Sequence, residues 1–193
     1  MKQRWSGWAL AAGALTISAA AFAAPPTPEM ISFACAGCHG TNGGSAGLTM
    51  PSLAAQSKAA IVEAMKKFKS GERPSTVMGR LAKGYSDADF EAMGAFFSRQ
   101  KIHFTNQTVD KAKAAKGADL QEANCSRCHL DDGKDGKDDT PVMASQWLEY
   151  LKMQAELYDS GKRKMPKDMA EKWNRLSKED REALLHFYAG VSK

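Results

Sequence analysis

The chain has 193 residues, of which 43% are hydrophobic and 25% charged, and it carries a formal net charge of +5 and four cysteines. This composition excludes a disordered chain and a collagen-like repeat, and the length allows one large domain or two small ones. The positive charge is not gathered into a basic stripe and no nucleic-acid reader motif accompanies it, so the sequence does not indicate nucleic-acid binding.

Residues 1–23 have the pattern of a secretory signal peptide. Lys2 and Arg4 precede an apolar run from Trp8 to Phe22. The small residues Ala21 and Ala23 at the end of this segment suit cleavage after about Ala23. A retained membrane anchor is the alternative, but the run is shorter than the roughly 20 residues that span a bilayer. We therefore expect a periplasmic protein that does not span the membrane, with a net charge of +3 once the two basic residues are removed.

The next predicted element is a helix that begins at Thr27, with proline and an acid in its first turn. It leads into the C-x-x-C-H motif Cys35-Ala36-Gly37-Cys38-His39. Two thiols on nearly the same helix face can add to two vinyl groups of one porphyrin, and the adjacent imidazole can bind the iron. A disulfide or a Cys/His zinc module is the alternative. We expect haem c on Cys35 and Cys38, with His39 as the proximal iron ligand.

A second helix is predicted from Ser57 to Lys69, and it stops at Gly71. Met78 lies 39 residues after His39, and we expect it on a loop that faces the other side of the haem. A thioether opposite histidine raises the reduction potential and closes the iron to substrates, which suits one-electron transfer. The alternative is a methionine of the hydrophobic core, which is the commoner role of this residue.

The second half of the chain repeats the first. The offset is 90 residues as far as Gly161 and 91 beyond it. The second C-x-x-C-H motif is Cys125-Ser126-Arg127-Cys128-His129. Met169 matches Met78, although Met165 stands four residues earlier and is an alternative ligand. We therefore expect a second haem on Cys125 and Cys128, with His129 and Met169 as its axial ligands.

Helices in the second unit are predicted to match those of the first. One runs into Cys125, another covers Trp147 to Tyr158, and each unit ends in a helix with a capping box, at Ser86 and Ser177. No alternating β pattern of useful length is present. The predicted fold is all-α, with a first cytochrome c domain at 24–100, a linker at 101–107 and a second domain at 108–193, each packed around its haem.

Tandem motifs with a methionine about 40 residues further on resemble the diheme cytochromes c of bacterial periplasms. More specifically, the stretch from Lys67 to Phe97 is similar to the cytochrome subunit of flavocytochrome c sulfide dehydrogenase, and so are residues 162–169 and 186–189. The resemblance implies two cytochrome c folds related by a pseudo-twofold, with the haem edges close together. It also implies a separate FAD-containing flavoprotein that oxidises sulfide, and a downstream acceptor such as another cytochrome.

The chain itself has no G-x-G-x-x-G motif and no βαβ pattern, so we expect no FAD in it and no catalysis by this chain alone. One alternative is a free-standing diheme cytochrome of the c-four type that feeds a terminal oxidase. Another is a diheme peroxidase, but two repeat-matched methionines argue against the open iron site that it needs.

Six basic residues lie close to Met78 in the sequence. They could surround an exposed haem edge and attract an acidic partner, or they could simply be the solvated face of two helices. These residues are Lys66, Lys67, Lys69, Arg73, Arg80 and Lys83.

Overall fold

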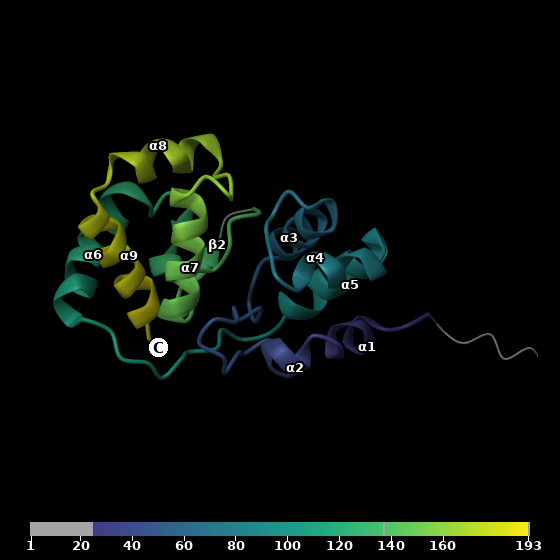
Figure 1. The fold of residues 1–193 in the computed structure, drawn as a ribbon. Coiled ribbons are helices and arrows are strands. Elements are labelled where there is room, and N and C mark those ends of the chain that lie inside the picture. Colours follow the sequence, from purple (N-terminus) through teal and green to yellow (C-terminus); the bar gives the residue numbers. More distant parts are fainter. Residues whose placement is uncertain (1–24, 137, 193) are drawn as a thin grey trace, which may run out of the picture.

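The computed structural model describes residues 25–136 and 138–192, and it folds them into two helical units that lie side by side (Figure 1). The predicted signal peptide at residues 1–23 lies outside the described residues. Within them, no helix is both long and apolar enough to cross a membrane.

The first unit contains α1 (Pro28–Phe33), α2 (Ala36–His39), α3 (Lys58–Ser70), α4 (Met78–Leu81) and α5 (Asp87–Phe97), with a single 3₁₀ turn at Ala82–Gly84. Helices α1 and α3 both pack against α5. The core between them is almost entirely apolar. Its buried members are Ile61, Val62, Met65, Ala82, Phe90, Met93, Phe96 and Phe97.

The second unit contains α6 (Lys111–Asn124), α7 (Leu148–Asp159), α8 (Lys167–Arg175) and α9 (Lys178–Gly190). Helices α6 and α9 approach closely at Gly117, where a Cβ atom would lie 2.2 Å from the carbonyl oxygen of Ala183. Two-residue strands β1 (His129–Leu130) and β2 (Asp135–Gly136) pair antiparallel around a 3₁₀ turn at Asp131–Gly133. The predicted all-α class is confirmed, because these strands are the only departure within the described residues.

Three helix starts follow the predicted capping residues Thr27, Ser86 and Ser177, and Ser57 caps a fourth helix. The side chains of Thr27 and Ser57 accept hydrogen bonds from the first turns of α1 and α3, and Ser86 and Ser177 form complete capping boxes at α5 and α9. Helices α3 and α7 end at or just before glycines with positive φ, as predicted. These glycines are Gly71 and Gly161.

The prediction of a loop around each matched methionine is wrong. Met78 is the first residue of α4, and Met169 lies within α8. In the first unit, the hydroxyl of Ser75 accepts a hydrogen bond of 2.7 Å from the backbone N–H of Gly79. This bond satisfies an N–H group of the first turn, which allows a short helix to form directly after the Pro74 segment.

The repeat extends to individual backbone hydrogen bonds. The carbonyl of Gly43 accepts from two consecutive N–H groups, and so does that of Gly133. Ala55 donates its backbone N–H to the carbonyl of Phe97, and Ser145, at an equivalent position, donates to Tyr188. Each unit therefore ties the segment before its middle helix to the end of its last helix in the same way.

The units meet through the segments that follow the two C-x-x-C-H motifs. The side chain of Gln56 hydrogen bonds the backbone of Val142, and the side chain of Gln146 hydrogen bonds the backbone of Ser52. Gln56 matches Gln146 in the repeat, as Ser52 matches Val142, so the contact is reciprocal in the way that a twofold relation requires.

Candidate haem attachment sites

The first C-x-x-C-H motif forms a tight turn between two helices. Cys35 follows α1 and is the N-cap of α2, and the backbone N–H of His39 donates to the carbonyl of Cys35 at 2.9 Å. Cys35 and Cys38 form no disulfide. The predicted site residues of this motif are therefore brought together within one helical turn, with both thiols free to react.

The imidazole of His39 is buried, and its Nδ1 lies 2.8 Å from the carbonyl oxygen of Pro51. A carbonyl can only accept, so Nδ1 carries the proton and the lone pair is on Nε2. Burial lowers the pKa of His39, although the Pro51 carbonyl acts in the opposite direction. Burial raises the pKa of the Cys35 thiol, with the nearby Cys38 as a lesser cause. A neutral imidazole with Nε2 available is the form that binds a metal.

The second motif has the same local turn. Cys125 is the C-cap of α6, and the backbone N–H of His129 donates to its carbonyl at 3.0 Å. Cys125 and Cys128 also form no disulfide. Burial lowers the pKa of His129, and the carbonyl of Pro141 again opposes it. However, the buried Nδ1 of His129 makes no hydrogen bond within the described residues, unlike that of His39.

A polar network next to the second motif was not predicted from the sequence. The side-chain amide of Gln121 donates to the carbonyl of His129 at 2.7 Å, and the hydroxyl of Tyr188 donates to the side-chain oxygen of Gln121. Burial raises the pKa of Tyr188, so the phenol stays protonated. The equivalent first-unit residues are Ile31 and Phe97, so mismatches in the repeat mark the two positions but do not show that their side chains meet.

The methionines lie in different surroundings. Met78 is partly buried and packs against the core of the first unit. Met169 is partly buried in the first turn of α8, and Met165 is partly buried in the segment before Pro166. Both thioethers of the second unit therefore stay candidates for its second axial position.

The six basic residues near Met78 are mostly engaged within the chain. Lys66 and Lys67 pair with carboxylates, and the ammonium group of Lys69 donates to a backbone carbonyl. The guanidinium of Arg73 lies 4.7 Å from the ring centroid of Phe68 and donates to side chains of the second unit. Arg80 and Lys83, which follow Met78, have no ion pair with another described residue. Four of the six residues therefore have partners within the chain, and both alternatives for the cluster, a docking surface and a solvated face, stay open.

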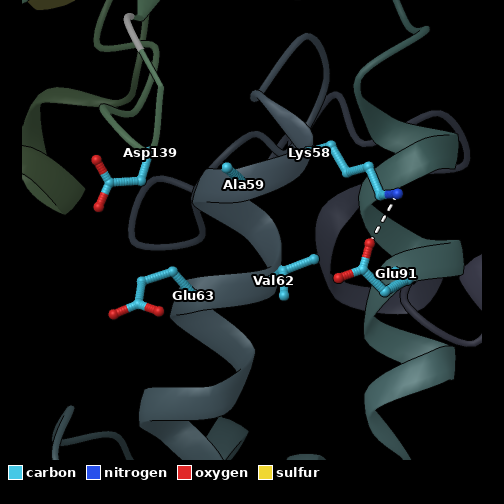
Figure 2. Close-up of a pocket in the computed structure, with 6 residues that line it drawn as sticks. All are labelled: Lys58, Ala59, Val62, Glu63, Glu91 and Asp139. Atoms are coloured by element: carbon cyan, nitrogen blue, oxygen red, sulfur yellow. Dashed lines mark ion pairs between the residues drawn. The ribbon is translucent and has the colours of Figure 1, made fainter.

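A surface pocket lies apart from both motifs. It has a volume of about 450 Å³ and lies between α3, α5 and the loop that carries Asp139. Figure 2 shows the 2.7 Å ion pair between Lys58 and Glu91 on one side of it, with Glu63 and Asp139 on the other. In the described part of the chain, no three His, Cys, Asp or Glu side chains form a group that could hold a metal ion, which the zinc alternative would need.

The chain is similar to known cytochromes in sequence and in structure. The family model described as cytochrome c oxidase, cbb3-type, subunit III matches residues 112–187. The crystal structure of reduced recombinant cytochrome c4 from Pseudomonas stutzeri superimposes with a TM-score of 0.74 at 26% identity, covering 86% of this chain and 97% of that one. The cytochrome subunit of sulfide dehydrogenase from Chlorobaculum tepidum is 45% identical over 36% of this chain, but the match covers only 62% of that relative.

A further relative decides the family. Cytochrome c-554(548) from Halomonas halodenitrificans is 31% identical over 70 residues, which are 35% of this chain and 84% of that protein. The chain belongs to the cytochrome c family. This assignment makes the protein a haem c electron carrier, and it confirms the resemblance inferred from the C-x-x-C-H motifs.

The residues of this cytochrome fit haem c. Each motif presents two free thiols for the vinyl groups and a buried imidazole for the iron. In the first unit, the bond from Nδ1 to the Pro51 carbonyl fixes the tautomer that ligation needs. In the second unit, the buried Nδ1 of His129 makes no hydrogen bond that would fix its tautomer. The carbonyl of Pro141 raises the pKa of His129, against the larger lowering effect of burial.

Proposed function

We propose that this cytochrome holds two haems, one in each of two domains at residues 24–100 and 108–193, joined by the linker at 101–107. Haem one would be attached to Cys35 and Cys38 and haem two to Cys125 and Cys128, with His39, Met78, His129 and Met169 as the axial ligands. Haem c supplies a reversible one-electron couple when it is bound. The matched cysteine and histidine turns of the two units support this assignment.

The protein's own residues would set each iron site for electron transfer rather than for substrate chemistry. In the first unit, His39 is held by the carbonyl of Pro51 and would supply one fixed ligand, and the thioether of Met78 would leave no position open for a substrate. The partly buried place of Met78 against the first core supports a ligand that stays in position. The segment at 101–107 contributes Thr105 and Gln107, which hydrogen bond the second unit at Ser145 and Gln146.

We further propose that the protein works in the periplasm as the electron-accepting subunit of a flavocytochrome c sulfide dehydrogenase. Electrons would pass from the FAD of a partner flavoprotein through the two haems to a downstream acceptor such as another cytochrome. The similarity to the sulfide dehydrogenase subunit of Chlorobaculum tepidum carries this proposal. Cleavage after about Ala23 would release the mature protein into the periplasm.

A free-standing carrier of the c-four type, feeding a terminal oxidase, is the second candidate. The superposition on cytochrome c4 along nearly its whole length favours it. The two candidates share every haem ligand and differ only in whether a flavoprotein accompanies the chain.

Co-purification from the native periplasm separates the two candidates. The subunit proposal predicts an equimolar FAD-containing protein that stays with the tagged cytochrome through gel filtration, and reduction of the haems when sulfide is added to the complex. A cytochrome that elutes alone, and that sulfide reduces no faster in the extract than in buffer, would support the free carrier instead.

A further inference from the structure

We propose that Gln146 is a crossed positioning residue, which fixes from the second unit the peptide group that orients the proximal histidine of the first, while Gln56 holds the equivalent peptide group of the second unit. The inference rests on the proposed function, because it assigns His39 and His129 to the two irons. It adds a direct structural link between the haem sites that the ligand assignment does not contain.

The link runs through a single peptide plane of the first unit. The carbonyl of Pro51 and the N–H of Ser52 belong to the same planar peptide group, so neither can rotate without the other. The carbonyl end lies 2.8 Å from Nδ1 of His39. The N–H end donates to the side-chain oxygen of Gln146 at 2.9 Å, across the boundary between the units.

The same glutamine also holds the following carbonyl. Its side-chain N–H donates to the carbonyl oxygen of Ser52 at 2.8 Å, so both backbone polar groups of Ser52 are bound by one amide. Gln146 and Ser52 are 3% and 4% exposed, respectively. The first bond holds the peptide plane between Pro51 and Ser52, and the second holds the next plane, so the backbone on both sides of Ser52 has little freedom to turn.

The reciprocal contact has the same form. The N–H of Val142 donates to the side-chain oxygen of Gln56 at 3.0 Å, and the side-chain N–H of Gln56 donates to the carbonyl of Val142 at 2.8 Å. The N–H of Val142 shares its peptide plane with the carbonyl of Pro141, the counterpart of the Pro51 carbonyl in the repeat. Gln146 therefore reaches His39 through a hydrogen bond, whereas the peptide plane held by Gln56 makes no hydrogen bond to His129.

The chemical consequence concerns the electron density at the iron. A peptide that donates through its N–H becomes a better acceptor at its carbonyl, because hydrogen bonds in a chain polarise one another. A stronger acceptor at Nδ1 makes the imidazole a more basic ligand, which favours the oxidised iron and lowers the reduction potential. The effect is expected at haem one, because His39 makes the hydrogen bond and His129 does not.

The test replaces each glutamine by methionine, which has a similar length but neither donor nor acceptor. In the full haem-loaded chain, Gln146→Met is expected to raise the potential of haem one and leave haem two nearly unchanged. Gln56→Met removes the equivalent bonds in the second unit and is expected to leave both potentials nearly unchanged, because His129 makes no hydrogen bond to the peptide that Gln56 holds. Redox titration followed by visible spectroscopy measures both potentials, and the one that falls in Met78→Ala is assigned to haem one.

A matched control removes a different bond between the units. The indole N–H of Trp147 donates to the carbonyl of Ser45 at 2.8 Å, and this bond lies outside both proline peptide planes. Trp147→Phe should destabilise the contact between the units but produce no crossed shift. Equal shifts of both haems in all three variants would overturn the inference, because they would mean that the glutamines act only as interface contacts.

The wild-type protein provides a measurement that needs no variant. The backbone N–H groups of Ser52 and Val142 should exchange with solvent slowly, since both are buried donors to glutamine, and rapid exchange at either would overturn the inference. A haem assay on each preparation separates the two proposals. A chain without covalent haem contradicts the proposed function, whereas a chain with two haems and no crossed shift contradicts only the role of the glutamines.

Discussion

The two units have the same helix order but fill one pair of matched positions in opposite ways. In the first, Ala82 and Phe90 are both fully buried in the apolar core. Their matches in the second are Trp173 and Arg181, whose guanidinium lies 5.2 Å from the indole ring centroid. Trp173 and Arg181 both donate to the same carboxylate oxygen of Asp159, at 2.7 and 2.8 Å.

The same arrangement of helices is therefore stabilised in two different ways. A small residue beside a buried phenylalanine gives the first unit a close-packed apolar centre. In the second unit, a large aromatic residue and an arginine exchange part of that burial for hydrogen bonds, an ion pair and a cation–π contact. Together with Gln121 and Tyr188, these groups make the second unit more polar than the first at these matched positions, and its haem would experience that difference.

The largest expected effect is the loss of one unit's haem. Cys35→Ser with Cys38→Ser should abolish the covalent haem of the first unit, and Cys125→Ser with Cys128→Ser that of the second. Each double variant should retain half of the haem measured as its pyridine complex, and should lose helical circular dichroism from the emptied unit, because the haem is part of its core. Full retention of haem in either variant would contradict the assignment.

The axial methionines come next. Met78→Ala and Met169→Ala should each remove about half of the weak absorbance band at the red end of the oxidised spectrum and lower the potential of one haem. Met165→Ala is the matched control and should leave the band intact. If Met165→Ala removes half of the band and Met169→Ala none, the ligand of the second unit is Met165.

Replacing the matched residues Phe90 and Arg181 by alanine should lower the free energy of unfolding more in the first unit than in the second. Phe90→Ala should cost about 3–5 kcal/mol, because it opens a cavity in a fully buried apolar site. Arg181→Ala should cost only about 1–2 kcal/mol, because the arginine is partly exposed and its contacts are polar. Urea unfolding of the haem-loaded variants measures both losses. Equal losses would mean that the polar cluster packs as tightly as the apolar core.

The polar network of the second unit can be converted to the first-unit pattern. Tyr188→Phe alone should cost about 1–3 kcal/mol, since it leaves the buried side-chain oxygen of Gln121 without its donor. The double variant Tyr188→Phe with Gln121→Ile copies Phe97 and Ile31 and should recover part of that loss. The double variant could instead lose more free energy of unfolding than the two single variants lose together. That result would show that the network stabilises more than the hydrogen bonds of Gln121 and Tyr188.

The smallest effect should be the same in both units. Ser86→Ala and Ser177→Ala each remove a capping-box hydroxyl and should each cost about 1 kcal/mol in thermal or urea unfolding. A clear difference between the two values would show that the last helices are not equivalent, despite their matched caps.

The sequence predicted what depends on local chemistry. The caps at Thr27, Ser86 and Ser177 follow from short-range hydrogen bonding, which needs no knowledge of the fold. The turn of each C-x-x-C-H motif follows for the same reason. The loop expected at Met78 failed because a single hydroxyl, that of Ser75, stabilises a helical turn there.

Features that depend on contacts between distant segments could not be predicted. The repeat showed that Gln56 and Gln146 are equivalent, but equivalence does not say what either side chain binds. Their partners are 86 and 94 residues away along the chain and lie in the other unit. Likewise, the mismatch of Phe97 and Tyr188 was visible, but the hydrogen bond of Tyr188 to Gln121 depends on how α6 and α9 pack.

The most direct test of the two-haem account is intact mass spectrometry of the mature protein from a host that can attach haem c, followed by peptide mapping. We predict a mass increase of two haems, with one haem on the peptide that contains Cys35 and Cys38 and the other on the peptide that contains Cys125 and Cys128. A mass increase of one haem or none, with the remaining thiols free to react with an alkylating reagent, would contradict the account.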